Sequence, residues 1–118
     1  MTATIVLIIL FIHWVADFVC QTDWQAKNKS KNNEALVNHI LIYSAITTIA
    51  WLAFGFNIDA ASIFLCTFIC HFITDYITSR INSKLYAKGK IHYFFVSIGF
   101  DQILHYAQLF FMYEFLIK

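Results

Sequence analysis

The chain alternates between long apolar segments and short polar connections. The apolar segments cover about residues 2–21, 35–56, 59–80 and 91–117, and Lys, Arg and Glu are almost absent from them. Each segment is long enough to cross a hydrocarbon core of about 30 Å as an α-helix. The two-residue alternation of a transmembrane β-barrel is absent, and backbone groups in lipid need internal partners. The pattern predicts an all-α integral membrane four-helix bundle that forms a single domain over residues 1–118.

Composition agrees with this prediction. Hydrophobic residues make up 60% of the chain and charged residues only 13%, and proline is absent. Soluble domains carry about a quarter charged residues. A soluble bundle would have to bury four helices that are apolar on nearly every face, which a chain of 118 residues is too short to do. We therefore expect a multi-pass membrane protein whose partners are membrane lipids, with a homo-oligomer left open. The net charge of +1 gives no basis for a nucleic-acid partner.

Basic residues are distributed unevenly over the connections. Seven of the eight lie between the first and second or between the third and fourth apolar segments. They are Lys27, Lys29, Lys31, Arg80, Lys84, Lys88 and Lys90. The connection between the second and third segments has none, and only Lys118 lies on the opposite side. The positive-inside rule predicts that both basic loops are cytoplasmic and that both termini lie outside.

Histidine and aspartate recur inside the apolar segments at a spacing of four residues. The pairs are His13 with Asp17, His71 with Asp75 and, in reverse order, Asp101 with His105. This spacing places both side chains of a pair on one helix face. In the predicted topology the aspartate of each pair lies nearer the cytoplasm and the histidine lies deeper. The pattern predicts an aspartate layer above a histidine layer, with His39 of the second segment closing the ring.

Buried aspartates in a membrane require partners. Each ionised aspartate at mid-helix costs about 2.5–3.5 kcal/mol, and neighbouring carboxylates repel one another. Protons or a cation must compensate this charge. A structural hydrogen-bonded network and a proton or ion pathway are two explanations. The third, which we favour, is a divalent metal site, with zinc first and manganese or iron as alternatives. Its predicted ligands, enough for two ions, are His13, Asp17, His39, His71, Asp75, Asp101 and His105.

A metal near the cytoplasmic headgroups would lower the pKa of bound water to about 7 and supply hydroxide for hydrolysis. We predict Asp17, Asp75 and Asp101 as catalytic residues. The predicted substrate-binding residues are Gln21, Ser79 and Arg80. Sequence motifs of serine hydrolases, P-loop proteins and zinc proteases are absent. The sequence thus predicts an intramembrane metal-dependent hydrolase for a lipid or another membrane-proximal substrate. The alternatives are a small ion- or proton-coupled transporter or channel, and a non-catalytic membrane factor.

Three ordered blocks carry a resemblance to a known family. They are His13-x-x-Ala-Asp-Phe-x-x-Gln-Thr-Asp-Trp24, His71-Phe-x-x-Asp75-x-x-x-Ser-Arg80 and Gly99-Phe-Asp-Gln-x-x-His105. Together they resemble the signature of a bacterial and phage membrane family, domain of unknown function 3307, over nearly the whole chain. The resemblance implies a bacterial inner-membrane location and brings no established activity. More distantly, the pattern is similar to that of small membrane proteins described as metal-dependent hydrolases.

Overall fold

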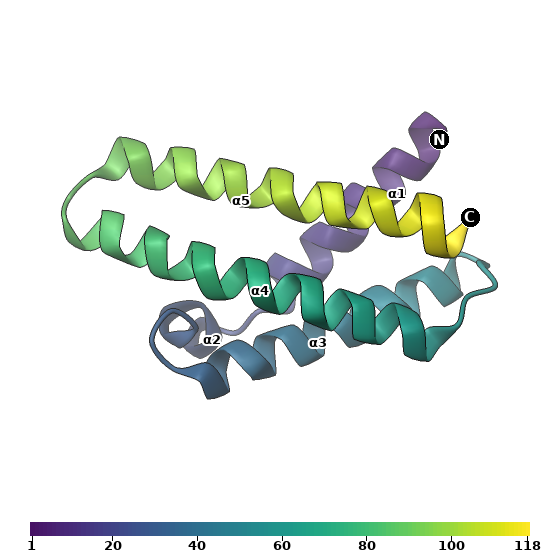
Figure 1. The fold of residues 1–118 in the computed structure, drawn as a ribbon, viewed down its shortest axis with the longest axis horizontal. Helices are drawn as coiled ribbons and strands as arrows, with labels where there is room; N and C mark the ends of the chain where they lie inside the picture. The colour runs from purple at the N-terminus through teal and green to yellow at the C-terminus, as the bar shows by residue number, and fades with distance from the viewer.

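The computed structural model describes residues 1–118, almost all of which are helical (Figure 1). Helix α1 spans Ala3–Trp14 and continues as one π-helical turn, η1, over Val15–Val19. The other helices are α2 (Asp23–Asn28), α3 (Asn33–Ala53), α4 (Ala60–Ala87) and α5 (Ile91–Met112), which ends in a π-helical turn, η2, over Tyr113–Ile117. No strand is present, so the predicted all-α class is confirmed.

The long helices form an antiparallel bundle. Helix α4 packs between α3 and α5, while α1 crosses behind them and contacts α3 and α5 (Figure 1). The α4–α5 turn and the segment around α2 lie at one end of the bundle. These two connections hold five of the eight basic residues, and Arg80 and Lys84 lie in the part of α4 nearest to them, so this end is called the basic end below. Both chain termini and the α3–α4 connection lie at the opposite end (Figure 1).

Helices α4 and α2 differ most from the sequence prediction. Helix α4 continues to Ala87, because the polar residues after residue 80 are compatible with a helix and no breaker precedes Gly89. Gly89 adopts a φ of +69°, a left-handed conformation that ends the helix at low cost. The short helix α2 was not predicted. A capping box begins it, in which the Thr22 hydroxyl accepts from the Gln25 N–H and the Gln25 side chain accepts from the Thr22 N–H.

The interior is more polar than the surface. Apolar side chains from α1, α3, α4, α5 and η2 pack in one cluster near the end that holds the termini, with Trp51 and Ile9 fully buried in it. Elsewhere His, Asp, Ser and Thr dominate, and polar residues outnumber apolar ones among the 27 buried positions. Large apolar side chains instead cover the outward faces, for example Leu7 and Phe95, which are 66% and 64% exposed.

By length and apolar character, two helices qualify as membrane spans. These are α3 and α4, and the shorter apolar segment Ala3–Val19 does not reach the same length. Helices that pass this test also occur in the cores of soluble proteins. The four-span membrane bundle and its orientation therefore stay predictions.

Candidate metal centre

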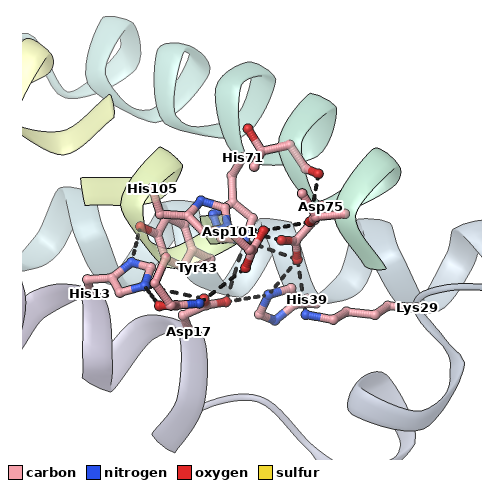
Figure 2. Close-up of polar contacts among 12 residues, drawn as sticks. His13, Asp17, Lys29, His39, Tyr43, His71, Asp75, Asp101 and His105 are labelled. Atoms are coloured by element: carbon pink, nitrogen blue, oxygen red, sulfur yellow. Dashed lines mark hydrogen bonds and ion pairs between the residues drawn. The ribbon is translucent and has the colours of Figure 1, made fainter. Parts of the chain in front are cut away.

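The fold brings the predicted ligands together in the middle of the bundle (Figure 2). They come from four parts of the chain that are distant in sequence: His13 and Asp17 from α1 and η1, His39 from α3, His71 and Asp75 from α4, and Asp101 and His105 from α5. All seven are at most 8% exposed. The four-residue spacing places each His and Asp of a pair on one helix face, and bundle packing directs these faces inward.

Four side chains form a closed ring of nitrogen and oxygen atoms. Asp17 Oδ1 lies 2.9 Å from His39 Nε2 and 3.5 Å from His71 Nε2. On the other side of the ring, Asp75 Oδ2 lies 3.5 Å from His39 Nε2 and 3.3 Å from His71 Nε2. Each histidine nitrogen therefore faces the same two carboxylate oxygens. The ring contains two imidazoles and two carboxylates, a donor set that suits zinc, manganese or iron.

The size of this ring fits a tetrahedral metal ion. With metal–ligand distances of about 2.0–2.1 Å, the edges of a regular tetrahedron measure about 3.3–3.4 Å. The four N···O separations, which are four of the six edges, run from 2.9 to 3.5 Å. One ligand atom from each of the four residues lies within 4.8 Å of every other. The first group, Asp17, His39, His71 and Asp75, can thus hold a metal ion.

A second group shares one carboxylate with the first. Asp75 Oδ1 lies 3.1 Å from His105 Nε2, which is itself 3.3 Å from Asp101 Oδ1. Ligand atoms of Asp75, Asp101 and His105 likewise lie within 4.8 Å of one another. Asp75 therefore directs Oδ2 to the first group and Oδ1 to the second. A carboxylate placed in this way can bridge two ions, as in hydrolytic sites with two metals.

Among the histidines of the first group, His71 is the one whose two ring nitrogens both lack a hydrogen-bond partner. It is only 1% exposed. Its Nε2 lies between two carboxylates at 3.3 and 3.5 Å without hydrogen-bond geometry to either one. Buried polar groups in folded proteins almost always have a partner. A metal ion at the centre of the first group would provide one.

His13 lies beside the two groups rather than within them. Its Nδ1 is 3.0 Å from the hydroxyl of Tyr43, and its Nε2 is 2.7 Å from Gln102 Oε1 and 3.4 Å from Asp17 Oδ2. In this position the ring orients Asp17, whose other oxygen faces the first group. Sequence reasoning missed Gln102, although it belongs to the third family block, because it lies off the face that carries Asp101 and His105.

Lys29 is a second residue that sequence reasoning did not assign to the site. Its Nζ lies 3.1 Å from Asp75 Oδ2, and its side chain is 19% exposed (Figure 2). Burial lowers the pKa of Lys29, but the carboxylates of Asp75 and Asp17 raise it by more, so the pKa lies above its usual value. In the sequence, Lys29 is one of three lysines in the same loop. A loop has no regular periodicity, so the sequence does not indicate which of these lysines points towards the site.

Asp17 lies within the π-helical turn η1. The Cys20 N–H bonds to the Val15 carbonyl at 3.0 Å, across five residues instead of four. Such turns are rare and are frequent at functional sites. On α5, Asp101 accepts a hydrogen bond from the Thr78 hydroxyl of α4 and a second from Gln102 Nε2. The carboxylate of Asp101 is therefore held by two side chains outside the metal groups.

A cavity of about 640 Å³ connects the carboxylates to the basic end. Asp17 and Asp101 line it, whereas none of the histidines does. Two predicted substrate-binding residues, Gln21 and Ser79, also line the cavity. Arg80 does not: its guanidinium lies 3.7 Å from the ring centre of Tyr76 and donates to Asn33 Oδ1 and to the Tyr76 carbonyl.

Comparison of the sequence with known proteins identifies a family whose function is unknown. No curated protein and no solved structure matches the chain. The family described as "Protein of unknown function (DUF3307)" matches residues 5–118, which include all seven His and Asp residues of the centre. On this match over nearly its whole length, the chain belongs to the DUF3307 family.

Proposed function

We propose that the protein is a membrane-embedded hydrolase that uses divalent metal ions, with zinc as the first candidate. The observation that carries this proposal is the position of Asp75. Its two oxygens face two separate groups of ligands within one buried cluster. Two-metal clusters of this kind occur in phosphatases, nucleases and aminopeptidases, where they stabilise both the attacking and the leaving oxygen.

The cavity supports catalysis rather than a purely structural role. A bound divalent ion supplies a nucleophile at neutral pH by acidifying water. Asp17 and Asp101 lie on the cavity wall, so a substrate that enters from the basic end reaches ligands of both groups. A structural His–Asp network would not need such access. Asp17, Asp75 and Asp101 are accordingly the proposed catalytic residues.

The distribution of apolar side chains supports a membrane location. The outward faces carry many large exposed hydrophobic residues, and the middle of the bundle is polar. A soluble protein rarely exposes contiguous apolar patches larger than a few hundred Å². Both basic connections share one end of the bundle, which suits a cytoplasmic face under the positive-inside rule. We propose four spans, with the metal centre opening towards the cytoplasm.

Transport is the weaker alternative. A transporter needs access to the site from both sides of the membrane, and here the cavity beside Asp17 and Asp101 is lined by residues of the basic end, such as Lys31. On the other side of the site, Ile9, Trp51 and Ile63 pack with their neighbours in an apolar cluster. The seven buried residues of this cluster are all apolar.

Metal analysis of the purified protein tests the proposal. We expect about two zinc ions per chain, in line with the two ligand groups, and hydrolysis that a chelator abolishes and zinc restores. His71→Ala removes a ligand of the first group and lowers both zinc content and activity. His92→Ala is the matched control, because this histidine is exposed and lies outside both groups. Folded wild-type protein that takes up no divalent metal would contradict the proposal.

A further inference from the structure

The substrate class follows from the cavity, given the metal centre proposed above. We propose that the cavity binds the phosphate group of an amphiphilic phosphomonoester, and that the reaction releases inorganic phosphate. This inference rests on the proposed hydrolase function and adds the chemistry of the substrate. Three independent features of the cavity wall support it: its charge, its unpartnered polar atoms and its apolar side.

The cavity wall has an excess of positive charge once metal ions neutralise its aspartates. Lys27, Lys29 and Lys31 all line the cavity, and the only acidic residues there are Asp17 and Asp101. Lys29 pairs with Asp75, whereas Lys27 and Lys31 form no ion pair. A neutral ester or amide would gain little from these ammonium groups. A dianionic phosphate would gain charge-assisted hydrogen bonds.

Several polar atoms on the same wall lack partners. The hydroxyl of Ser79, a residue only 7% exposed, is buried and unbonded. The side-chain oxygens of Gln21 and Asn82 are also buried without a partner. All three residues line the cavity, and their unpaired oxygens are buried in its wall. Buried polar groups of this kind call for a polar ligand. The Ser79 hydroxyl can donate to a phosphate oxygen, whereas the unpaired amide oxygens of Gln21 and Asn82 accept, so they suit water molecules that solvate the phosphate.

One part of the wall is apolar. Phe18 of η1 and Phe94 and Ile98 of α5 line the cavity together with Tyr86 near the end of α4. Phe18 and Tyr86 are 49% and 63% exposed, so the apolar wall continues onto the outer surface. A ligand with a phosphate head and a hydrocarbon tail would fit both parts of the wall. Its tail would leave the cavity along side chains that face lipid in the proposed membrane orientation.

The reaction balances without a further reactant. Water adds to phosphorus, the bond between phosphorus and the alcohol oxygen breaks, and the alcohol takes the proton that water gives up. The products are a free alcohol in the membrane and inorganic phosphate. Clusters of two metal ions are well suited to this chemistry, because they stabilise the attacking and the leaving oxygen together.

The first test compares substrates for the zinc-loaded protein in detergent micelles. We expect it to release phosphate from phosphatidate much faster than from the soluble monoester glycerol phosphate. Equal or faster release from glycerol phosphate would overturn the amphiphile part of the inference. Release of fatty acid from a neutral diacylglycerol, without phosphate release, would overturn the phosphate part.

The second test replaces the two lysines that have no ion pair. Lys27→Gln with Lys31→Gln should raise KM for phosphatidate by about tenfold to a hundredfold, the size of a lost charge-assisted hydrogen bond. Zinc content should not change, because neither lysine belongs to a ligand group. Lys88→Gln with Lys90→Gln is the matched control: it removes the same charge at the same end, outside the cavity lining. An unchanged KM in the first variant would contradict the inference.

A binding measurement separates this inference from the metal centre. Inorganic phosphate titrated into the zinc-loaded protein should give a shifted and broadened phosphorus NMR signal for the phosphate, and the Lys27→Gln, Lys31→Gln variant, which keeps its zinc, should weaken this effect. Protein that binds zinc and shows no phosphate binding or release overturns the phosphate cavity and leaves the metal centre standing. Phosphate binding by a protein that takes up no metal would overturn the metal centre and leave the phosphate cavity standing.

Discussion

At the scale of single residues, Asp75 is the centre of the site. It contacts His39 and His71 through Oδ2 and His105 through Oδ1, and Lys29 lies beside Oδ2. Four cationic or metal-binding groups thus converge on one buried carboxylate. Without a compensating charge such a carboxylate would be costly in this interior. With two metal ions bound, its position between the two groups becomes a strong source of affinity.

Substitution of the shared carboxylate should differ from substitution of an unshared one. We predict that Asp75→Asn reduces zinc binding at both groups, whereas Asp101→Asn reduces it at the second group only, because the first group contains no Asp101. Elemental analysis of both variants measures this difference. Asp59→Asn is the control, because Asp59 is exposed and its carboxylate accepts hydrogen bonds only from Ser62 and the Ala61 backbone, away from both ligand groups. Equal loss of zinc in the two site variants would contradict the bridging role.

The Tyr43 hydroxyl should stabilise the site through His13. Tyr43 is 2% exposed, and its hydroxyl lies 3.0 Å from His13 Nδ1. Tyr43→Phe leaves that buried nitrogen without a partner and should lower the free energy of unfolding by about 1–3 kcal/mol. Reversible unfolding in mixed detergent micelles measures it. Tyr93→Phe, at a position 62% exposed, should change little, and equal effects of the two variants would argue against the role of the hydrogen bond.

At the scale of elements, the four-residue spacing of the His–Asp pairs and the residues that begin and end each helix explain most of the architecture. The His–Asp pairs could be assigned to common helix faces from sequence, because the helical period fixes that relation within one segment. Contacts between segments depend on packing angles, so the sharing of Asp75 could not be predicted. Neither could the inward turn of Lys29, which depends on how the unpredicted helix α2 folds back. The Thr22–Gln25 capping box was a readable signal for that helix.

Two glycines of the α4–α5 hairpin should respond to alanine in opposite directions. Gly89 has a φ of +69° in the turn, a conformation that costs an L-residue about 1–2 kcal/mol, so Gly89→Ala should destabilise the fold by about that amount. Gly99 lies inside α5, and an added Cβ would meet nothing within 4 Å. Gly99→Ala should therefore stabilise the helix by about 0.5–1 kcal/mol. Unfolding measurements on both variants test this contrast. Changes of the same sign in the free energy of unfolding would contradict it.

At the scale of the whole molecule, the protein has a polar interior and an apolar surface. The all-α class followed from the apolar segments, and the joint placement of both basic loops at one end agrees with the arrangement expected from charge. Length and apolar character single out only α3 and α4 as spans, and the apolar segment Ala3–Val19 is shorter. The proposal of four spans therefore rests on the large apolar side chains exposed on the outer faces of the bundle.

The orientation of the bundle can be measured by cysteine labelling. In a background with Cys20, Cys66 and Cys70 replaced by alanine, Lys88→Cys should react with an impermeant maleimide only from the cytoplasmic side. Asn57→Cys, in the connection at the opposite end, should react only from outside, because the two loops lie at opposite ends of the bundle. Labelling of both positions from the same side would contradict a membrane-spanning bundle in the proposed orientation.

The existence of the metal centre is the central claim, and anomalous X-ray scattering from crystals of the zinc-loaded protein tests it most directly. Data collected on either side of the zinc absorption edge locate the ions without assumptions about the ligands. We predict one peak among Asp17, His39, His71 and Asp75 and a second among Asp75, Asp101 and His105. A folded, zinc-soaked protein with no anomalous peak within coordination distance of Asp75 would contradict it.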